Sequence, residues 1–219
     1  MSESEHDPFK GRADGIAMRL GLHAMPISER MTEAKRIILA RHGPVSSSLR
    51  TRISGHQFTE FVNELQASGL ASNATPPLES LSLAQAAAIL VTSDLLRSVQ
   101  SAQLLAPNKP TISDSVFREV QVPATIRSSV VLRRSTWIVM ARVLWLCRAW
   151  PGVESRFAAR ERAGDAARRL EQLADEYGGV FLVGHGYFNL LIARELRGRG
   201  WDGSRHPATR NWGTSTYLK

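Results

Sequence analysis

The sequence predicts an α/β fold, with one domain built on a mostly parallel sheet that helices cover on both faces. Short apolar runs of strand length alternate with amphipathic helical patterns, which is typical of parallel strands joined by crossover helices. The chain has 219 residues, of which 43% are hydrophobic, enough for one such domain with short insertions. Two of the apolar runs end in a His-Gly pair, so both histidines are expected where a strand ends.

The first expected strand is the apolar run 37–40, followed by a loop rich in serine and arginine. Apolar residues at helical spacing predict a helix over 58–65 that ends before Gly69, with Ser54 as its N-cap. The remaining expected elements, in chain order, are a short helix at 82–87, a strand at 88–92, a helix at 95–105 capped by Ser93 and Asp94, a short strand at 111–117, an apolar helix at 135–150, a basic helix at 154–177, a strand at 180–183, a helix at 187–196 and a closing strand at 215–218.

The expected domain covers residues 34–219, with a helical insertion at about 121–164. Residues 1–33 precede the first convincing strand, and we expect them to form a flexible or weakly packed extension. They contain no uninterrupted apolar segment of the kind found in secretion signals, so the expected location is the cytoplasm.

The net charge of +8 predicts attraction to anions, which include phosphorylated metabolites, phosphoproteins, nucleic acid and anionic lipid. The most apolar stretch, 137–147, is too short to span a bilayer and is interrupted by Arg142, so no membrane partner is expected. The single cysteine, Cys147, lies in this stretch and is predicted to be a buried thiol without a reactive role.

The two His-Gly turns, at His42 and His185, predict phosphoryl-transfer chemistry. In open α/β sheets ligands bind at the carboxyl ends of the strands, so neighbouring strands would place both imidazoles and Arg41 in one pocket. Transfer of a phosphoryl group to histidine needs a neutral ring nitrogen, cations around the phosphate oxygens and an acid for the leaving group. His42 is the candidate nucleophile, Arg41 a bidentate phosphate clamp, and His185 a hydrogen-bond donor to the transferring group.

Two further residues complete this apparatus. Arg97 is expected in the first turn of a helix that follows a strand, where the helix dipole also favours anions. Glu119 follows a predicted short strand and is the candidate proton donor to the leaving oxygen.

The chain resembles the histidine phosphatase superfamily, also called the phosphoglycerate mutase-like family. The matching motifs occur in the family's order and cover roughly residues 35–218; they are 39–43 around the first His-Gly pair, 93–102, 117–119, and 183–186 around the second pair. The resemblance implies a phosphoglycerate mutase-like fold and a phosphate pocket formed by Arg41, His42, Arg97 and His185. It also implies phosphorylation of His42 during the cycle and Glu119 as proton donor, and it implies no metal or other cofactor.

Where mutase-type members continue the first motif with an acid or glutamine and then an asparagine, this chain has Pro44-Val-Ser-Ser-Ser48. The prediction is therefore a metal-independent phosphatase, acting on a phosphorylated small molecule or a phosphoprotein. Two alternatives stay open: a phospho-ligand-binding or regulatory member with little or no turnover, and a mutase-type phosphotransferase.

Other groups are assigned no role. The remaining histidines, His6, His23, His56 and His206, lack such neighbours, and no closely spaced ligand pair predicts a metal site. Arginines of the basic helix are interleaved with acidic residues, which favours a solvated, ion-paired surface over nucleic-acid binding. Trp137, Trp145 and Trp150 are expected in the core or at an interface.

Overall fold

The computed structural model describes residues 34–147 and 150–219. The predicted extension at 1–33 lies outside the described residues. The main sheet has six strands in the order β4-β3-β6-β1-β8-β7, and a separate two-stranded ribbon pairs β2 with β5. The strands are β1 (Arg36–Arg41), β2 (Arg52–Ser54), β3 (Ile89–Thr92), β4 (Thr111–Ser113), β5 (Val131–Arg133), β6 (Gly179–Gly184), β7 (Asp202–Gly203) and β8 (Thr214–Leu218).

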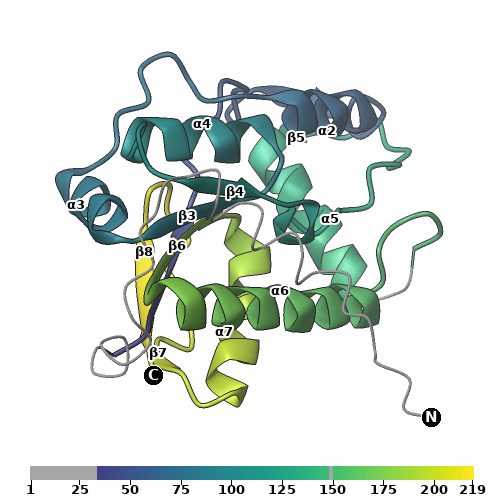
Figure 1. Cartoon of the computed structure of the whole chain (residues 1–219). Coiled ribbons are helices and arrows are strands. Elements are labelled where there is room, and N and C mark those ends of the chain that lie inside the picture. The colour runs from purple at the N-terminus through teal and green to yellow at the C-terminus, as the bar shows by residue number, and fades with distance from the viewer. Residues whose placement is uncertain (1–33, 148–149) are drawn as a thin grey trace, which may run out of the picture. The chain divides into compact units, whose positions relative to one another are not determined.

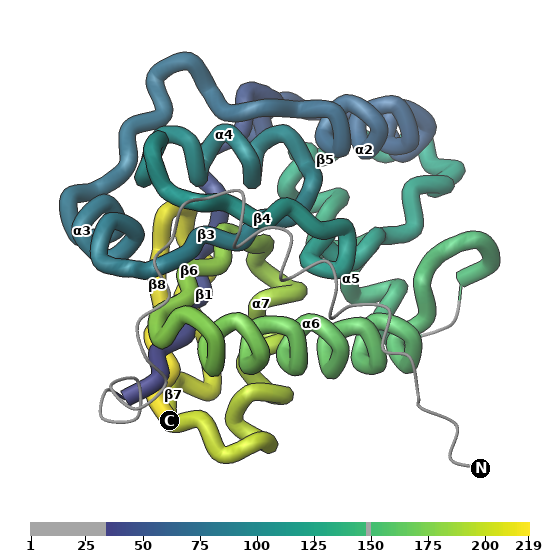
Figure 2. Tube along the Cα trace, in the orientation of Figure 1, coloured from purple at the N-terminus to yellow at the C-terminus, as the bar shows by residue number. Residues whose placement is uncertain are grey.

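Four adjacent strands of the sheet, β4, β3, β6 and β1, run parallel. At one edge β8 pairs antiparallel with β1, and β7 pairs antiparallel with β8. The two apolar runs that end in His-Gly are β1 and β6, which pair directly, with Arg41 opposite Gly184. Figure 2 shows β1 lying between β6 and β8. The pairing confirms that the two histidines leave the sheet side by side.

Helices cover both faces of the sheet, as predicted (Figure 1). The helices are α2 (Phe58–Ala67), α3 (Leu78–Ala86), α4 (Leu96–Leu105), α5 (Arg134–Cys147), α6 (Arg156–Tyr177) and α7 (Gly186–Gly198), with a 3₁₀ turn η1 (Ser115–Phe117). Alternate residues of β1 point to opposite faces. Ile37 and Leu39 join a core with α6 and α7, whereas Ile38 and Ala40 join a second core with α3 and α4.

A third apolar cluster lies under the β2–β5 ribbon. It joins Ile53 of β2 with Phe58 and Phe61 of α2 and with Trp137 and Ala141 of α5. The Trp137 indole N–H donates to the Ile53 carbonyl at 2.9 Å, so the buried ring is also satisfied as a polar group. Packing in this cluster holds α2, α5 and the β2–β5 ribbon together. No helix in the described ranges is long and apolar enough to cross a membrane.

The structure corrects several local predictions. Ser54 belongs to β2 and does not cap α2, whose N-cap position is occupied by Gln57 without a side-chain cap. Asp94 does not cap α4, because both of its oxygens bind Arg118 at 2.6 Å. The predicted strand at 111–117 splits into β4 and the turn η1.

The prediction that Cys147 is buried was wrong, since its side chain is exposed. The buried face of α5 is formed by Trp137, Ala141 and Trp145, at a spacing of four residues. A residue at 147 is rotated away from that line on a helix of 3.6 residues per turn. An apolar stretch therefore did not imply burial of every residue in it.

Candidate active site

His42, the first residue after β1, is nearly buried, with 6% of its surface exposed. Its backbone N–H donates to the Gly184 carbonyl of the neighbouring strand end at 3.1 Å. Its ring Nδ1 lies 2.7 Å from the Gly43 carbonyl oxygen. Because a carbonyl only accepts, Nδ1 must carry the proton, and Nε2 of the neutral ring then holds the free lone pair. This tautomer is the one that a nucleophilic Nε2 requires.

The turn after His42 requires glycine at position 43. A Cβ there would lie 2.2 Å from Cζ2 of Trp212, far inside van der Waals contact. The Gly43 N–H donates to the Ser101 hydroxyl at 3.0 Å, and the Asn211 side-chain amide donates to the carbonyls of His42 and Gly43 at 2.9 and 3.0 Å. These bonds hold the peptide whose oxygen orients the His42 ring.

His185 follows β6 in the same way and faces His42, with the ring centroids 5.2 Å apart and the planes tilted by 58°. Only 1% of its surface is exposed. Its Nε2 lies 2.7 Å from the Ser93 hydroxyl, at the end of β3. Its Nδ1 is buried and has no hydrogen-bond partner in the described part of the chain. If Ser93 donates to Nε2, Nδ1 carries the proton and is a ready donor to an anion.

The two predicted arginines reach the same place from different elements. Arg41 ends β1; its guanidinium donates to the Thr209 carbonyl, and its buried Nε has no partner within the described residues. Arg97, in the first turn of α4, is 5% exposed and donates to the Leu65 carbonyl at 2.9 Å. Burial lowers the pKa of both arginines, and the charge of Glu119 opposes that shift.

Both imidazoles are neutral near pH 7. Burial, followed by the charge of Arg97 and then that of Arg41, lowers the pKa of His42 to about 3, against the hydrogen bond to Gly43, which raises it. The pKa of His185 is well below its ordinary value, through burial first and then the charges of His42, Arg97 and Arg41. The pocket therefore combines fixed positive charge on two arginines with uncharged ring nitrogens, an arrangement suited to a phosphate dianion.

Glu119 lies after η1 and contacts the start of α7, directly after His185. Its Oε1 accepts the N–H groups of Val120 and Phe188 at 2.9 and 3.0 Å, and its Oε2 accepts the Tyr187 N–H at 3.1 Å. Both oxygens therefore accept backbone N–H groups, and those of Tyr187 and Phe188 belong to the first turn of α7. The structure brings Glu119 to the predicted pocket and also gives it a helix-capping contact that the sequence did not indicate.

Three neighbours of the site were not predicted from the sequence as site residues, although Ser93 was predicted as a helix cap. Ser93 follows β3 and orients His185, and its place at a strand end was an available signal. Arg142 of α5 donates to the Val120 carbonyl at 2.7 Å, and its guanidinium carbon lies 4.5 Å from the centre of the Tyr187 ring. An arginine inside an apolar helix was an available signal for this residue. Asn211 comes from the loop before β8, and no sequence pattern marked it.

The other predicted histidines do not join the pocket: His56 and His206 are exposed, and His6 and His23 lie outside the described residues. Across the two described ranges, no group of three or more histidine, cysteine or acidic side chains is arranged to hold a metal ion.

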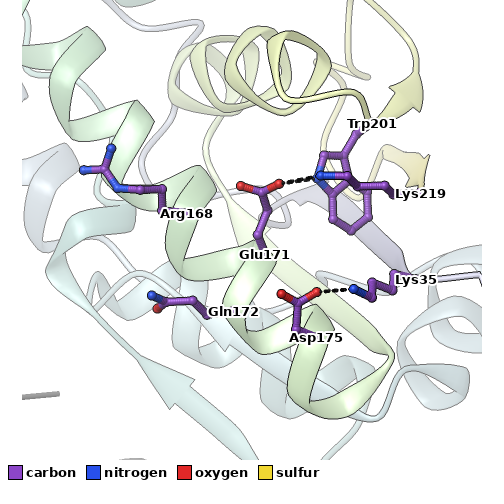
Figure 3. Close-up of a pocket in the computed structure, with 7 residues that line it drawn as sticks. All are labelled: Lys35, Arg168, Glu171, Gln172, Asp175, Trp201 and Lys219. Carbon is purple, nitrogen blue, oxygen red and sulfur yellow. Dashed lines mark hydrogen bonds and ion pairs between the residues drawn. The ribbon is translucent and has the colours of Figure 1, made fainter. Parts of the chain in front are cut away.

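A separate hollow lies where β1 begins, away from the carboxyl end of the sheet. Figure 3 shows two pairs among its side chains: Lys35 binds Asp175 at 2.6 Å, and the Trp201 indole donates to Glu171 at 2.8 Å. Glu171 also pairs with Arg199 and Lys219. These mutual pairings give the hollow a structural role at the start of the sheet.

Fold and pocket together define a class: an α/β protein with two neutral histidines, a buried arginine and a half-buried arginine gathered at the carboxyl edge of a parallel sheet. Residues 37–217 match the family model of the histidine phosphatase superfamily, branch 1, and the chain belongs to that superfamily. No curated protein matches the sequence significantly.

Solved structures share this fold at low sequence identity. The mycobacterial glucosyl-3-phosphoglycerate phosphatase is 19% identical over 84% of this chain and 90% of its own, with a TM-score of 0.53. A phosphoglycerate mutase from Bacillus anthracis is 12% identical over 87% and 90%, with a TM-score of 0.57. A phosphoserine phosphatase from Entamoeba histolytica is 16% identical over 83% and 89%, with a TM-score of 0.51. These likenesses establish the phosphoglycerate mutase-like fold.

Proposed function

We propose that this protein is a metal-independent phosphatase that hydrolyses a phosphorylated small molecule or a phosphoprotein through a phosphohistidine on His42. The observation that carries the proposal is the orientation of the His42 ring. Its Nδ1 is held by the Gly43 carbonyl at 2.7 Å, which directs the lone pair to Nε2, the atom that must attack phosphorus.

In the proposed reaction, His42 Nε2 forms a bond to phosphorus while the bond from phosphorus to the leaving oxygen breaks. Arg41 and Arg97 bind the equatorial oxygens, and His185 donates from Nδ1 to the transferring group. Glu119 supplies the proton that the leaving oxygen takes. Water then attacks the phosphorus of phospho-His42, Glu119 accepts a proton from that water, and inorganic phosphate leaves with the His42 ring restored.

Hydrolysis of an aryl phosphate tests the proposal. Wild-type protein should release phosphate and acquire acid-labile phosphate on the protein, and His42→Ala should lose both while keeping its fold. The matched control is His56→Ala, which replaces an exposed histidine and should behave as wild type. Turnover retained in His42→Ala contradicts the mechanism. A panel of phosphorylated metabolites and phosphopeptides then identifies the substrate, and transfer of the phosphoryl group to an acceptor other than water would identify a mutase.

A second candidate is a phospho-ligand-binding member with little turnover. The contact that favours it is at Glu119, whose oxygens already accept three backbone N–H groups and must also exchange a proton during catalysis. Glu119→Gln separates the two functions. If the protein is a phosphatase, Glu119→Gln lowers turnover most strongly with alkyl phosphates, because their leaving groups need an acid, and less with aryl phosphates. A binding protein shows vanadate binding without turnover in both forms.

A further inference from the structure

Positive charge is concentrated in the middle segment of the chain. Residues 121–160 contain seven arginines and one glutamate, so this stretch carries +6 of the net charge of +8. The single glutamate, Glu154, is itself paired with Arg162 of α6 at 2.7 Å. The segment includes α5, which packs against the third apolar cluster and is exposed on its outer side.

Exposed arginines lie at both ends of α5. At its start, Arg52 and Arg133 stand directly opposite each other in the β2–β5 ribbon, and Arg50 and Arg127 lie in the neighbouring loops. At its far end, α6 begins with the exposed Arg156 and Arg160. None of these six forms a salt bridge within the described ranges. Like charges facing each other across a ribbon repel, so the arrangement favours an anionic partner.

Between these arginine groups, α5 presents an apolar stripe to solvent, made of Val139, Met140, Val143 and Leu146. These side chains are 62%, 40%, 51% and 38% exposed. They recur at helical spacing on the side away from the buried Trp137, Ala141 and Trp145. Phe157, near the far end, is 71% exposed. The stripe is therefore a continuous apolar face with positive charge at each end.

We propose that the apolar stripe of α5 and its flanking arginines dock the protein on an anionic phospholipid membrane. The helix would lie in the plane of the interface, with the stripe at the boundary of the acyl chains and the arginines at the lipid phosphates. No membrane partner was expected from the sequence because no segment is long enough to span a bilayer, but docking on the membrane surface needs no such span.

Charge and exposed apolar surface favour an anionic bilayer over a second copy of the chain or a nucleic acid as the partner of this face. A second copy of the chain would bring the same arginine groups toward each other, which repulsion opposes. Nucleic acid would satisfy the arginines but would leave the aliphatic side chains of the stripe in water. An anionic bilayer satisfies both the arginines and the stripe. The inner side of α5 carries Arg142, which contacts Tyr187 beside His185, so docking would hold the pocket near the lipid surface.

Vesicle sedimentation of the full chain tests the proposal, with vesicles of phosphatidylglycerol and phosphatidylcholine in equal parts and vesicles of phosphatidylcholine alone. Wild type should bind the anionic vesicles, more weakly as salt rises, and the neutral ones about tenfold less. The double variant V139E/V143E should lose about tenfold or more in binding. The matched control is Leu104→Glu, at a leucine of α4 that is 47% exposed, which should bind as wild type.

A second variant, R156Q/R160Q, changes charge without touching the stripe and should weaken binding to anionic vesicles only. Circular dichroism and aryl-phosphate turnover report whether each variant is folded.

Equal binding of wild type and V139E/V143E overturns the proposal, as does equal binding to both vesicle types. A wild-type dimer that dissociates in V139E/V143E without any vesicle binding would assign the stripe to self-association, and RNA binding without vesicle binding would assign the arginines to nucleic acid. Both results overturn the proposal.

Discussion

Acidification should destabilise this protein through His42. The perturbation is a change from pH 7.5 to 4.5, compared between wild type and His42→Gln. The folded pKa of His42 is lowered from 6.5 to about 3, mainly by burial and by Arg97. A lowered histidine pKa means that the unfolded chain binds more protons between these values, so stability falls as the pH drops through 6.5 toward 3.

The magnitude follows from the shift. The pH of 4.5 lies two units below the unfolded pKa of 6.5. At this pH His42 is protonated in the unfolded chain and still neutral in the folded protein. At about 1.4 kcal/mol per unit, this removes about 3 kcal/mol from the free energy of unfolding, a large part of the stability of a small domain. The carboxylates with lowered pKa, Asp94, Glu64 and Glu171, add the same pH dependence in both proteins and cancel in the difference. The difference therefore reports His42 together with its coupling to His185.

Urea unfolding followed by tryptophan fluorescence at a series of pH values measures the effect. The free energy of unfolding of wild type should fall by about 3 kcal/mol more than that of His42→Gln over this range. His56→Gln, at an exposed histidine, is the control and should follow the wild type. Parallel curves for wild type and His42→Gln would refute the argument that burial and the arginines keep His42 neutral.

Three other predictions concern the geometry of the pocket. Gly43→Ala should cost about 1–3 kcal/mol, measured as a lower urea midpoint, because the new Cβ would meet Trp212 at 2.2 Å; an unchanged midpoint would mean that the Trp212 ring moves aside freely. Arg97→Ala should weaken vanadate binding roughly 10- to 150-fold, the range expected when a charge-assisted hydrogen bond is lost; titration with undiminished affinity would remove Arg97 from the anion site. Ser93→Ala should lower kcat/KM about 2- to 10-fold with little change in stability, and an unaltered kcat/KM would show that Ser93 does not orient His185.

The expected core elements of the sheet were recognisable because fully buried parallel strands leave continuous apolar runs, as in β1 and β6. The β2–β5 ribbon was not recognised, since each of its strands has three residues and their pairing joins positions about eighty residues apart. The exposed position of Cys147 was mispredicted for a related reason: which side of α5 is buried depends on α2 and β2, which lie far away in the sequence.

The sequence by itself determined the α/β class, the strand ends at which His42 and His185 emerge, and the superfamily, because these depend on local patterns of apolar residues and short motifs. Only the tertiary structure decided how these groups act together. The 2.7 Å contact that sets the His42 tautomer is local, but the bonds from Ser101 and Asn211 that hold its turn come from residues distant in sequence. The orientation of His185 by Ser93 and the capping contacts of Glu119 also join elements distant in sequence. Burial and nearby charge, which control the pKa of each imidazole, exist only once the strands, loops and helices have packed together.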